Sequence, residues 1–230
     1  MSLPYRSLIL DHDDTVVDST AAVHFPAYLE ALKRFRPEVQ PLDLRGWFRK
    51  NFHPGIMSLL RDELRLTDEE MVEEYQLWRS FALKRRPRFF PGMIELLSEY
   101  SRLGGRIAVV SHSESDIIER DYRETGGGVV VPEIILGWEL EESQRKPEPW
   151  PVFEVMRRLS LDAEDILVVD DLKPAVLMAQ AAGVDIAAAG WAHQIPEIME
   201  YMKENCTYFC ETLEELRAVI LGGNGARTSA

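Results

Sequence analysis

The chain of 230 residues is poor in cysteine and lacks long apolar segments. Its only cysteines, Cys206 and Cys210, have no second Cys or His pair nearby that would complete a zinc site, so we interpret them as buried, reduced thiols in one strand. No run of about 18 apolar residues indicates a membrane span. The N-terminus leads into a strand without the basic and apolar regions of a signal peptide. We therefore expect a cytoplasmic protein.

Positive charge is also scarce, because the formal net charge is -13. This argues against nucleic acids and anionic membranes as partners. The negative charge is not spread evenly along the chain. Residues 18–87 hold 12 Lys or Arg and 11 Asp or Glu, whereas the rest of the chain holds 14 Lys or Arg and 28 Asp or Glu. Such a change predicts that residues 18–87 form a separate unit.

What the chain does contain is ordinary for a globular protein, with 46% hydrophobic and 28% charged residues. Its length suits one large domain, or one domain that carries a smaller inserted one. Residues 20–86 show helical periodicity, as in Phe25, Leu29, Leu32 and Phe35, and a T-x-x-E capping box at Thr67 predicts a further helix. We expect an all-helical insertion over residues 18–87.

The remaining residues alternate between strands and helices, which predicts a parallel sheet covered on both faces. The fold class is therefore α/β, with residues 1–17 and 88–230 as the core domain. A polar, Gly-rich tail is expected over residues 222–230. The expected strands are residues 7–10, 107–110, 129–136, 166–169, 184–189 and 207–210.

Several of these strands end in polar side chains: Asp11 and Asp13, Ser111, and Asp170 with Asp171. Parallel strands bring their carboxyl ends to one edge of the sheet, where ligands bind in open α/β folds. Carboxylates are the ligands that Mg²⁺ prefers. Taken alone, the first D-x-D is as easily read as an acidic turn that caps a strand, so the interpretation depends on the whole set.

Four segments together resemble the motifs of the haloacid dehalogenase superfamily: LILDHDDTVVDS, VVSHS, RKPEP and ILVVDDLKPAVLMAQAAGV. The third is similar to the Lys-Pro motif of the branch that contains phosphoglycolate phosphatase and β-phosphoglucomutase, and the helical insertion lies where that branch carries its α-helical cap. The resemblance implies a Rossmann-like, doubly wound core with an inserted α-helical cap.

The resemblance also implies roles for the matching residues. Asp11 would be the nucleophile and Asp13 the general acid and base, with Lys146 as a third catalytic residue. Ser111, the backbone N–H of His112 and Thr15 would bind the phosphoryl group or substrate. Mg²⁺ would be held by Asp11, the carbonyl of Asp13, Asp171 and Asp170, the last directly or through water.

Two positions depart from the motifs of the family. Asp14 replaces the usual Gly in a tight turn, and we expect the turn to survive because Asp tolerates the left-handed conformation; its charge would alternatively perturb the pKa of Asp13. His112 replaces a frequent Asn, either as a specificity feature or as a solvent-facing residue that acts through its backbone.

The cap loop of such proteins selects the substrate, which makes Arg49, Lys50 and His53 candidates to bind an anionic group distal to the phosphate. The alternative is a solvated helix end whose cations complement the helix dipole.

These patterns predict a Mg²⁺-dependent hydrolase, a phosphatase for a small phosphorylated metabolite, acting as a monomer or homodimer. The alternatives are a phosphomutase similar to β-phosphoglucomutase and a catalytically silent binding protein.

Overall fold

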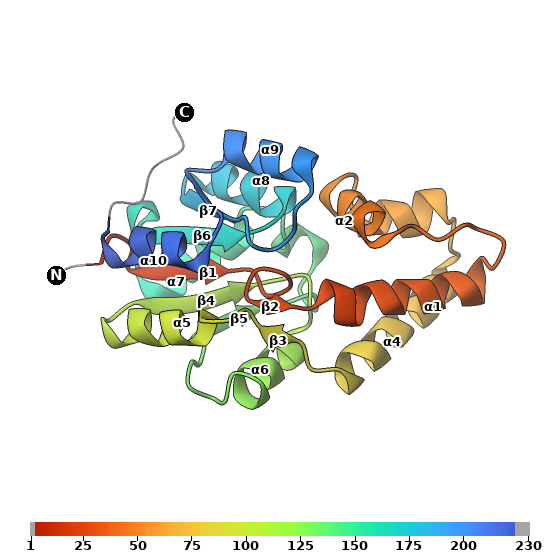
Figure 1. Cartoon of the computed structure of the whole chain (residues 1–230), viewed down its shortest axis with the longest axis horizontal. Coiled ribbons are helices and arrows are strands. Elements are labelled where there is room, and N and C mark those ends of the chain that lie inside the picture. The colour runs from red at the N-terminus through yellow and green to blue at the C-terminus, as the bar shows by residue number, and fades with distance from the viewer. Residues whose placement is uncertain (1–2, 224–230) are drawn as a thin grey trace. The chain divides into compact units, whose positions relative to one another are not determined.

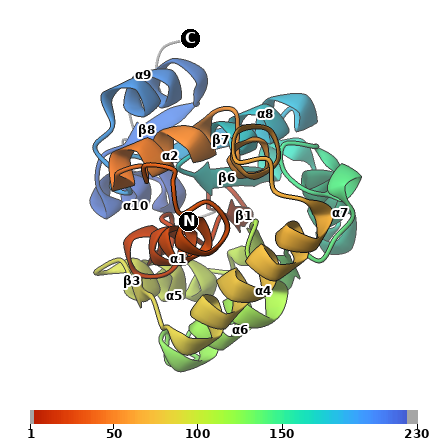
Figure 2. The same cartoon turned by 90° about the vertical axis from the view of Figure 1, so that its right-hand side faces the viewer.

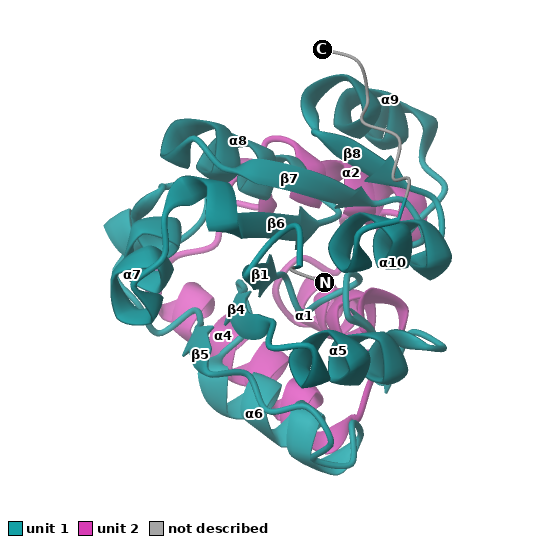
Figure 3. Cartoon of the chain, turned by 90° about the vertical axis from the view of Figure 1, so that its left-hand side faces the viewer, with its two compact units in different colours: residues 1–17, 88–230 teal, residues 18–87 magenta. Residues whose placement is uncertain are grey.

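The computed structural model describes residues 3–223, and the chain divides into two compact units. Unit 1 joins Met1–Val17 to Arg88–Ala230, and unit 2 is Asp18–Pro87 (Figure 3). Unit 2 covers the residues in which the charge balance changes. A two-stranded sheet of β2 (Val17–Asp18) and β3 (Arg88–Phe89) lies where the chain leaves unit 1 and returns to it.

Unit 1 is built on a six-stranded sheet with the order β5-β4-β1-β6-β7-β8 (Figure 1). All five strand pairings are parallel, and Leu8 of β1 lies between Ile107 of β4 and Leu167 of β6. The predicted α/β class with a parallel sheet is therefore confirmed. The strands are β1 (Ser7–Leu10), β4 (Arg106–Val110), β5 (Ile134–Leu136), β6 (Ile166–Asp170), β7 (Asp185–Ala189) and β8 (Tyr208–Cys210).

Helices cover both faces of this sheet, and the central strands β1 and β6 are therefore buried on both sides. Leu8 and Leu10 share one core cluster with side chains of α5, α6 and α10, while α7 and α8 pack together on the other side (Figure 3). The helices are α5 (Met93–Arg102), α6 (Ser115–Glu124), α7 (Trp150–Leu159), α8 (Lys173–Ala182), α9 (Pro196–Asn205) and α10 (Leu213–Leu221).

Unit 2 is helical, and α1 packs against α4 (Figure 2). Its core is aromatic, with the rings of Tyr28 and Trp47 4.7 Å apart. The predicted capping box is present, because Thr67 and Glu70 each bind the other's backbone N–H. The helices are α1 (Phe25–Phe35), α2 (Leu44–Phe52), α3 (Ile56–Ser58) and α4 (Asp68–Lys84), with π-helical turns at Thr20–His24 and Leu59–Glu63.

Two predicted elements are wrong in extent. The strand expected over residues 129–136 is only β5, because Gly127 and Gly128 adopt positive φ, Pro132 has no N–H, and Val131 is 75% exposed. Cys206 ends α9 and only Cys210 lies in a strand, although both thiols are buried and free.

At the C-terminus, α10 ends at Gly222 in the left-handed conformation, and the rest of the expected tail, from residue 224, lies outside the described residues. None of the helices in residues 3–223 combines the length and the apolar character needed to cross a membrane.

Candidate active site

Four polar groups that sequence analysis assigned to one site come together at the carboxyl edge of the sheet in unit 1. Asp11 directly follows β1, Asp170 is the last residue of β6, and Asp171 follows it. One carboxylate oxygen from each of these three residues lies within 4.8 Å of the others. Lys146, from the loop before α7, reaches the same place.

Lys146 connects the two strand ends. Its Nζ lies 2.9 Å from Oδ1 of Asp11 and 2.7 Å from Oδ2 of Asp170, and all three side chains are at most 10% exposed. Burial by itself would lower the pKa of Lys146, but the carboxylates of Asp11 and Asp170 outweigh it and raise this pKa. Lys146 is therefore a permanent cation that holds Asp11 in place.

One lysine does not balance three buried carboxylates. Burial raises the pKa of Asp170, as do the neighbouring charges of Asp11 and Asp171, while Lys146 opposes this. Burial likewise raises the pKa of Asp171. Burial thus disfavours the ionised forms of both carboxylates, and a bound cation would favour them.

These features fit a divalent cation. Mg²⁺ takes hard oxygen ligands, usually one or two carboxylates with water and a phosphate oxygen. Oδ2 of Asp171 is buried, and its contact with Nε2 of His193, at 3.5 Å, is too long for a strong hydrogen bond, so this oxygen has capacity for a ligand. Asp11, Asp170 and Asp171 would hold the ion.

Asp13 has a different environment from Asp11, although only one residue separates them. Its Oδ2 accepts a hydrogen bond from Oγ of Ser113 at 2.5 Å and a long one from Oγ of Ser111 at 3.5 Å. Its carboxylate is not part of the three-aspartate cluster. Two neighbouring carboxylates with different partners can perform different chemical tasks.

Comparison with known proteins agrees with this geometry. Residues 8–189 match the family described as haloacid dehalogenase-like hydrolase. The chain belongs to this family. It is therefore a hydrolase whose core contains the strand-end aspartates.

Curated members of the family that resemble the chain are phosphatases. Phosphoglycolate phosphatase 1 of Pseudomonas aeruginosa is 32% identical over 206 residues, which cover 83% of this chain and 72% of that protein. Pyrophosphatase PpaX of Bacillus velezensis is 22% identical over 190 residues, covering 80% of this chain and 83% of its own. These relatives place the chain in the phosphoglycolate phosphatase-like branch and support a phosphatase.

Solved structures show the same fold. A putative haloacid dehalogenase-like hydrolase from Bacteroides fragilis has a TM-score of 0.76 at 20% identity, covering 92% of this chain and 99% of that one. A putative phosphoglycolate phosphatase from Lactobacillus delbrueckii has a TM-score of 0.73 at 21% identity, covering 95% and 99%.

Thr15 contacts the aspartate cluster of this dehalogenase-like hydrolase. Its hydroxyl donates to Oδ1 of Asp171 at 3.3 Å, and its backbone carbonyl accepts from Nε1 of Trp191 at 3.0 Å. The residue is fully buried. Thr15 therefore orients a carboxylate of the cluster, and its role in substrate binding stays a prediction.

Ser111 and His112 lie after β4, as expected. Ser111 is buried, and its Oγ accepts a hydrogen bond from the N–H of Ser113 at 3.2 Å. His112 is exposed overall, and its Nε2 lies 3.0 Å from the backbone carbonyl of Lys146. The ring thus has a contact of its own within unit 1.

Asp14 adopts the left-handed conformation with φ of 57°, so the expectation that the turn survives without Gly is confirmed. Its N–H donates to the carbonyl of Val17 at 2.7 Å, which closes the turn. Burial would lower the pKa of His193, but Asp171 and, more weakly, Asp14 raise it. His193 lies 3.5 Å from Oδ2 of Asp171.

The three candidates of the insertion lie in unit 2. Arg49 and Lys50 are in the last turn of α2, and His53 follows the helix. Nζ of Lys50 lies 2.5 Å from a carboxylate oxygen of Glu63 in the same unit. This ion pair partly neutralises the charge of Lys50. A role for Arg49, Lys50 and His53 in substrate binding stays a prediction.

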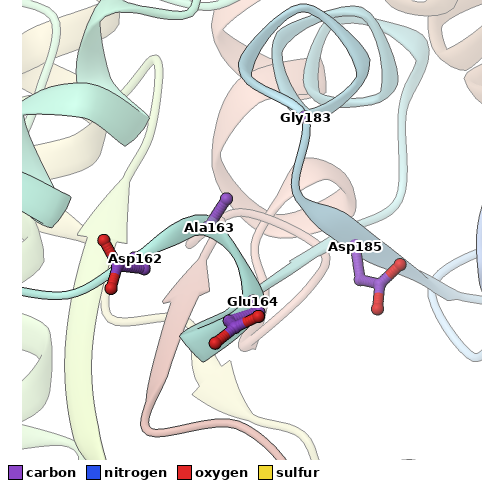
Figure 4. Close-up of a pocket in the computed structure, with 5 residues that line it drawn as sticks. All are labelled: Asp162, Ala163, Glu164, Gly183 and Asp185. Carbon is purple, nitrogen blue, oxygen red and sulfur yellow. The ribbon is translucent and has the colours of Figure 1, made fainter.

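A separate hollow of about 560 Å³ lies at the opposite ends of the strands (Figure 4). Asp162 and Glu164 precede β6, and Asp185 begins β7. An acidic lining repels phosphate esters, so the size of this hollow does not make it the substrate site. The carboxyl edge remains the candidate.

Two residues near this site were missed by sequence reasoning. Ser113 stands in the same strand-end cluster as Ser111 but carried no assigned role. His193 follows β7 in the loop Gly190–Gln194. Both residues follow parallel strands, β4 and β7, so the convergence of polar groups at the carboxyl edge is the signal that could have found them.

Proposed function

We propose that this phosphatase is a Mg²⁺-dependent phosphomonoester hydrolase that acts on a small phosphorylated metabolite through an aspartyl-phosphate intermediate. The observation that carries the proposal is the contrast between Asp11 and Asp13. Asp11 faces Lys146 and the other two aspartates, whereas Asp13 faces two serine hydroxyls. The contact with Lys146 positions Asp11 for nucleophilic attack, and the separate hydroxyl contacts of Asp13 suit a residue that transfers protons.

In the first step, a carboxylate oxygen of Asp11 attacks phosphorus, and the ester bond to the leaving alcohol breaks. Asp13 donates its proton to that alcohol oxygen. In the second step, Asp13 takes a proton from water, whose oxygen attacks the phosphorus of the aspartyl phosphate, and Asp11 is released as a carboxylate. Lys146 holds Asp11 throughout and balances charge on the phosphoryl group.

Asp170 and Asp171 complete the site by binding the cation. When bound, Mg²⁺ supplies positive charge that stabilises the phosphoryl oxygens in the transition state. Ser111 contributes a hydroxyl beside the same position, and Thr15 keeps Asp171 oriented. A cytoplasmic location and a monomeric or dimeric state stay predictions.

The proposal is tested by phosphate release from a panel of phosphorylated metabolites, with phosphoglycolate first because several relatives carry its name. We expect turnover that needs Mg²⁺ and stops with EDTA. Asp11→Asn should lower kcat by at least about 1,000-fold because it removes the nucleophile. Rapid quenching should trap phosphate on a peptide that contains Asp11.

Unchanged turnover by Asp11→Asn would overturn this mechanism. The phosphomutase alternative predicts that β-glucose 1-phosphate yields glucose 6-phosphate in place of inorganic phosphate. Silence of the wild-type protein over the whole panel would favour the binding protein.

A further inference from the structure

Ser113 lies in the loop between β4 and α6, and the reaction steps proposed above give it no task. The residue is 2% exposed, so its polar groups depend on partners within the protein. Its N–H donates to Oγ of Ser111 at 3.2 Å, and its carbonyl accepts from the N–H of Trp138 at 2.9 Å. Its hydroxyl donates to Oδ2 of Asp13 at 2.5 Å. This one residue therefore joins the loops that follow β1, β4 and β5.

The backbone of Ser113 has little room to move. A Cβ atom at Gly137 would lie 2.7 Å from the carbonyl oxygen of Ser113 and 2.7 Å from the nitrogen of Ser115, so the two loops are in close backbone contact. The strands β4 and β5 pair directly before this point, with Val110 opposite Leu136. Helix α6 then begins at Ser115. The hydroxyl of Ser113 is therefore presented to the turn after β1 from a fixed backbone.

Ser111 and Ser113 both contact Asp13, but not in the same way. Oγ of Ser111 lies 3.5 Å from Oδ2 of Asp13, at the limit of a hydrogen bond. Because Oγ of Ser111 already accepts the N–H of Ser113, its own hydrogen points elsewhere, toward Asp13 or toward a bound phosphoryl group. Ser111 is thus able to exchange Asp13 for the substrate, whereas Ser113 makes the short contact.

A fixed contact on one oxygen matters for a residue that transfers protons. A carboxyl group that accepts a hydrogen bond at Oδ2 carries its own proton on Oδ1. The hydrogen bond from Ser113 therefore decides which oxygen of Asp13 carries the proton and how the carboxyl group is turned. General acids work only within hydrogen-bond reach of the atom that they protonate, and a small displacement of the group lowers the rate.

We propose that Ser113 is a positioning residue that holds the carboxyl group of Asp13 in the orientation from which it protonates the leaving alcohol. Ser113 acts through Asp13 and transfers no proton to the substrate itself. The proton passes from Asp13 to the alcohol oxygen as that oxygen separates from phosphorus, and Asp11 forms the new bond to phosphorus. This inference rests on the proposed hydrolase function and adds the residue on which its general-acid catalysis depends.

The test compares two small compounds whose leaving groups differ in their need for a proton. Ethyl phosphate releases an alcohol whose anion is strongly basic, whereas acetyl phosphate releases acetate, which leaves without a proton. Ser113→Ala should lower kcat/KM for ethyl phosphate by roughly 10- to 100-fold, the worth of a hydrogen bond to a charged group. It should lower kcat/KM for acetyl phosphate by less than about threefold. The best alkyl ester of the metabolite panel should lose as much as ethyl phosphate.

The loss for the alkyl esters should lie in kcat, with KM changed by less than about threefold, because Ser113 does not bind the substrate. Ser113→Thr keeps the hydroxyl and should recover most of the activity. If Ser113→Ala does not fold, Ser113→Cys takes its place with the same expectation, because a thiol is a weak donor of similar size. Ser101→Ala, at an exposed serine of α5, is the matched control and should behave as the wild type.

A second background shows whether Ser113 acts through Asp13. Asp13→Asn has no proton to transfer and should show the same dependence on the leaving group. In that protein, Ser113→Ala should change kcat/KM for ethyl phosphate by less than about threefold, because the group that it positions no longer transfers protons. Equal losses for ethyl phosphate and acetyl phosphate, or the full loss in the Asp13→Asn protein, would overturn the inference.

Urea denaturation separates this inference from the hydrolase proposal, because it needs no turnover. Ser113→Ala should lower the urea midpoint of the wild-type protein, and it should leave the midpoint of the Asp13→Ala protein unchanged or raise it, since the hydroxyl there lacks its acceptor. Turnover without this coupling would overturn the inference and leave the hydrolase standing. Absence of turnover for both compounds and for the whole metabolite panel would overturn both.

Discussion

At the scale of single residues, the turn after β1 depends on positions with little freedom. Asp14 has φ of 57°, a conformation that costs most residues about 1–2 kcal/mol and costs Gly nothing. Its N–H closes the turn onto Val17. The position therefore accepts Gly, Asn or Asp, which tolerate the left-handed conformation, better than other residues.

We expect Asp14→Ala to lower the free energy of unfolding by about 1–2 kcal/mol, whereas Asp14→Gly should stay within about 1 kcal/mol of the wild type. Urea denaturation measures both. Ser160→Gly, at another left-handed residue far along the chain with φ of 52°, is the control and should be neutral or stabilising. Equal stability of Asp14→Ala and Asp14→Gly would contradict this account of the turn.

A buried charge network lies behind the same turn. His12, between the two proposed catalytic aspartates, has its Nε2 3.2 Å from Oδ2 of Asp121, and both side chains are 1% exposed. Arg120 donates from Nε to the other oxygen of Asp121 at 2.9 Å. The carboxylate of Asp121 thus contacts both the buried imidazole of His12 and the buried guanidinium of Arg120.

Asp121→Ala should lower the free energy of unfolding by about 3–5 kcal/mol, because it leaves Arg120 and His12 buried without this acceptor. Chemical denaturation is the measurement. Asp121→Asn keeps an acceptor and should lose less, and Glu119→Ala on the exposed side of α6 should be close to neutral. A loss below about 1 kcal/mol in Asp121→Ala would show that the network contributes little.

At the scale of elements, helix α4 carries the carboxyl group of Glu74 at a position where burial disfavours the ionised form. Burial raises the pKa of Glu74 to about 7, whereas the unfolded chain ionises it near its ordinary value of about 4.3. Between these two values the folded protein binds the proton more strongly than the unfolded chain does. Stability from this residue is therefore greatest at low pH and falls as the pH rises through this range.

Glu74→Gln should accordingly be more stable than the wild type by about 1–2 kcal/mol at pH 8, because partial solvent screening reduces the full effect of the shift. At pH 4 the two proteins should be equally stable. Thermal or urea unfolding at both pH values is the measurement, with Glu73→Gln on the neighbouring position as control. A difference that does not change with pH would show that ionisation of Glu74 is not the cause.

At the scale of the whole molecule, the proposed metal site draws ligands from β1 and β6, which are separated by most of the chain. Asp11 comes from residues near the N-terminus, and Asp170 and Asp171 come from the fourth strand in the sheet order. A cation held by all three would stabilise the folded state only, because the unfolded chain does not bring them together.

Mg²⁺ should therefore raise Tm, by an amount that grows with concentration; at 100 times Kd the gain is about 2.7 kcal/mol. EDTA should reverse it, and Asp171→Asn should abolish most of the response. Glu164→Gln, in the acidic hollow of Figure 4, is the matched control and should keep the full response. Calorimetric scans measure the shift. A response that Glu164→Gln removes and Asp171→Asn keeps would place the ion elsewhere.

Local interactions made a large part of this structure predictable. The capping box at Thr67 begins α4, Gly183 ends α8, and the short apolar runs that end in Asp11, Ser111 and Asp170 are strands of one parallel sheet. Each signal acts over a few residues, through backbone hydrogen bonds, φ preferences or side-chain period, and so can be read from neighbours in the sequence.

The tertiary structure decided what depends on residues far apart. Residues 129–133 resemble a strand by composition, yet only Ile134–Leu136 finds hydrogen-bonding partners on β4. Thr15 donates a hydrogen bond to Asp171, and Ser113 donates one to Asp13. Arg145 lies over the ring of Trp138. These contacts form because separate loops meet at the carboxyl edge. The sequence determined which groups are present at the strand ends, and packing determined which of them touch, since hydrogen bonds and ion pairs form only at distances that the folded chain sets.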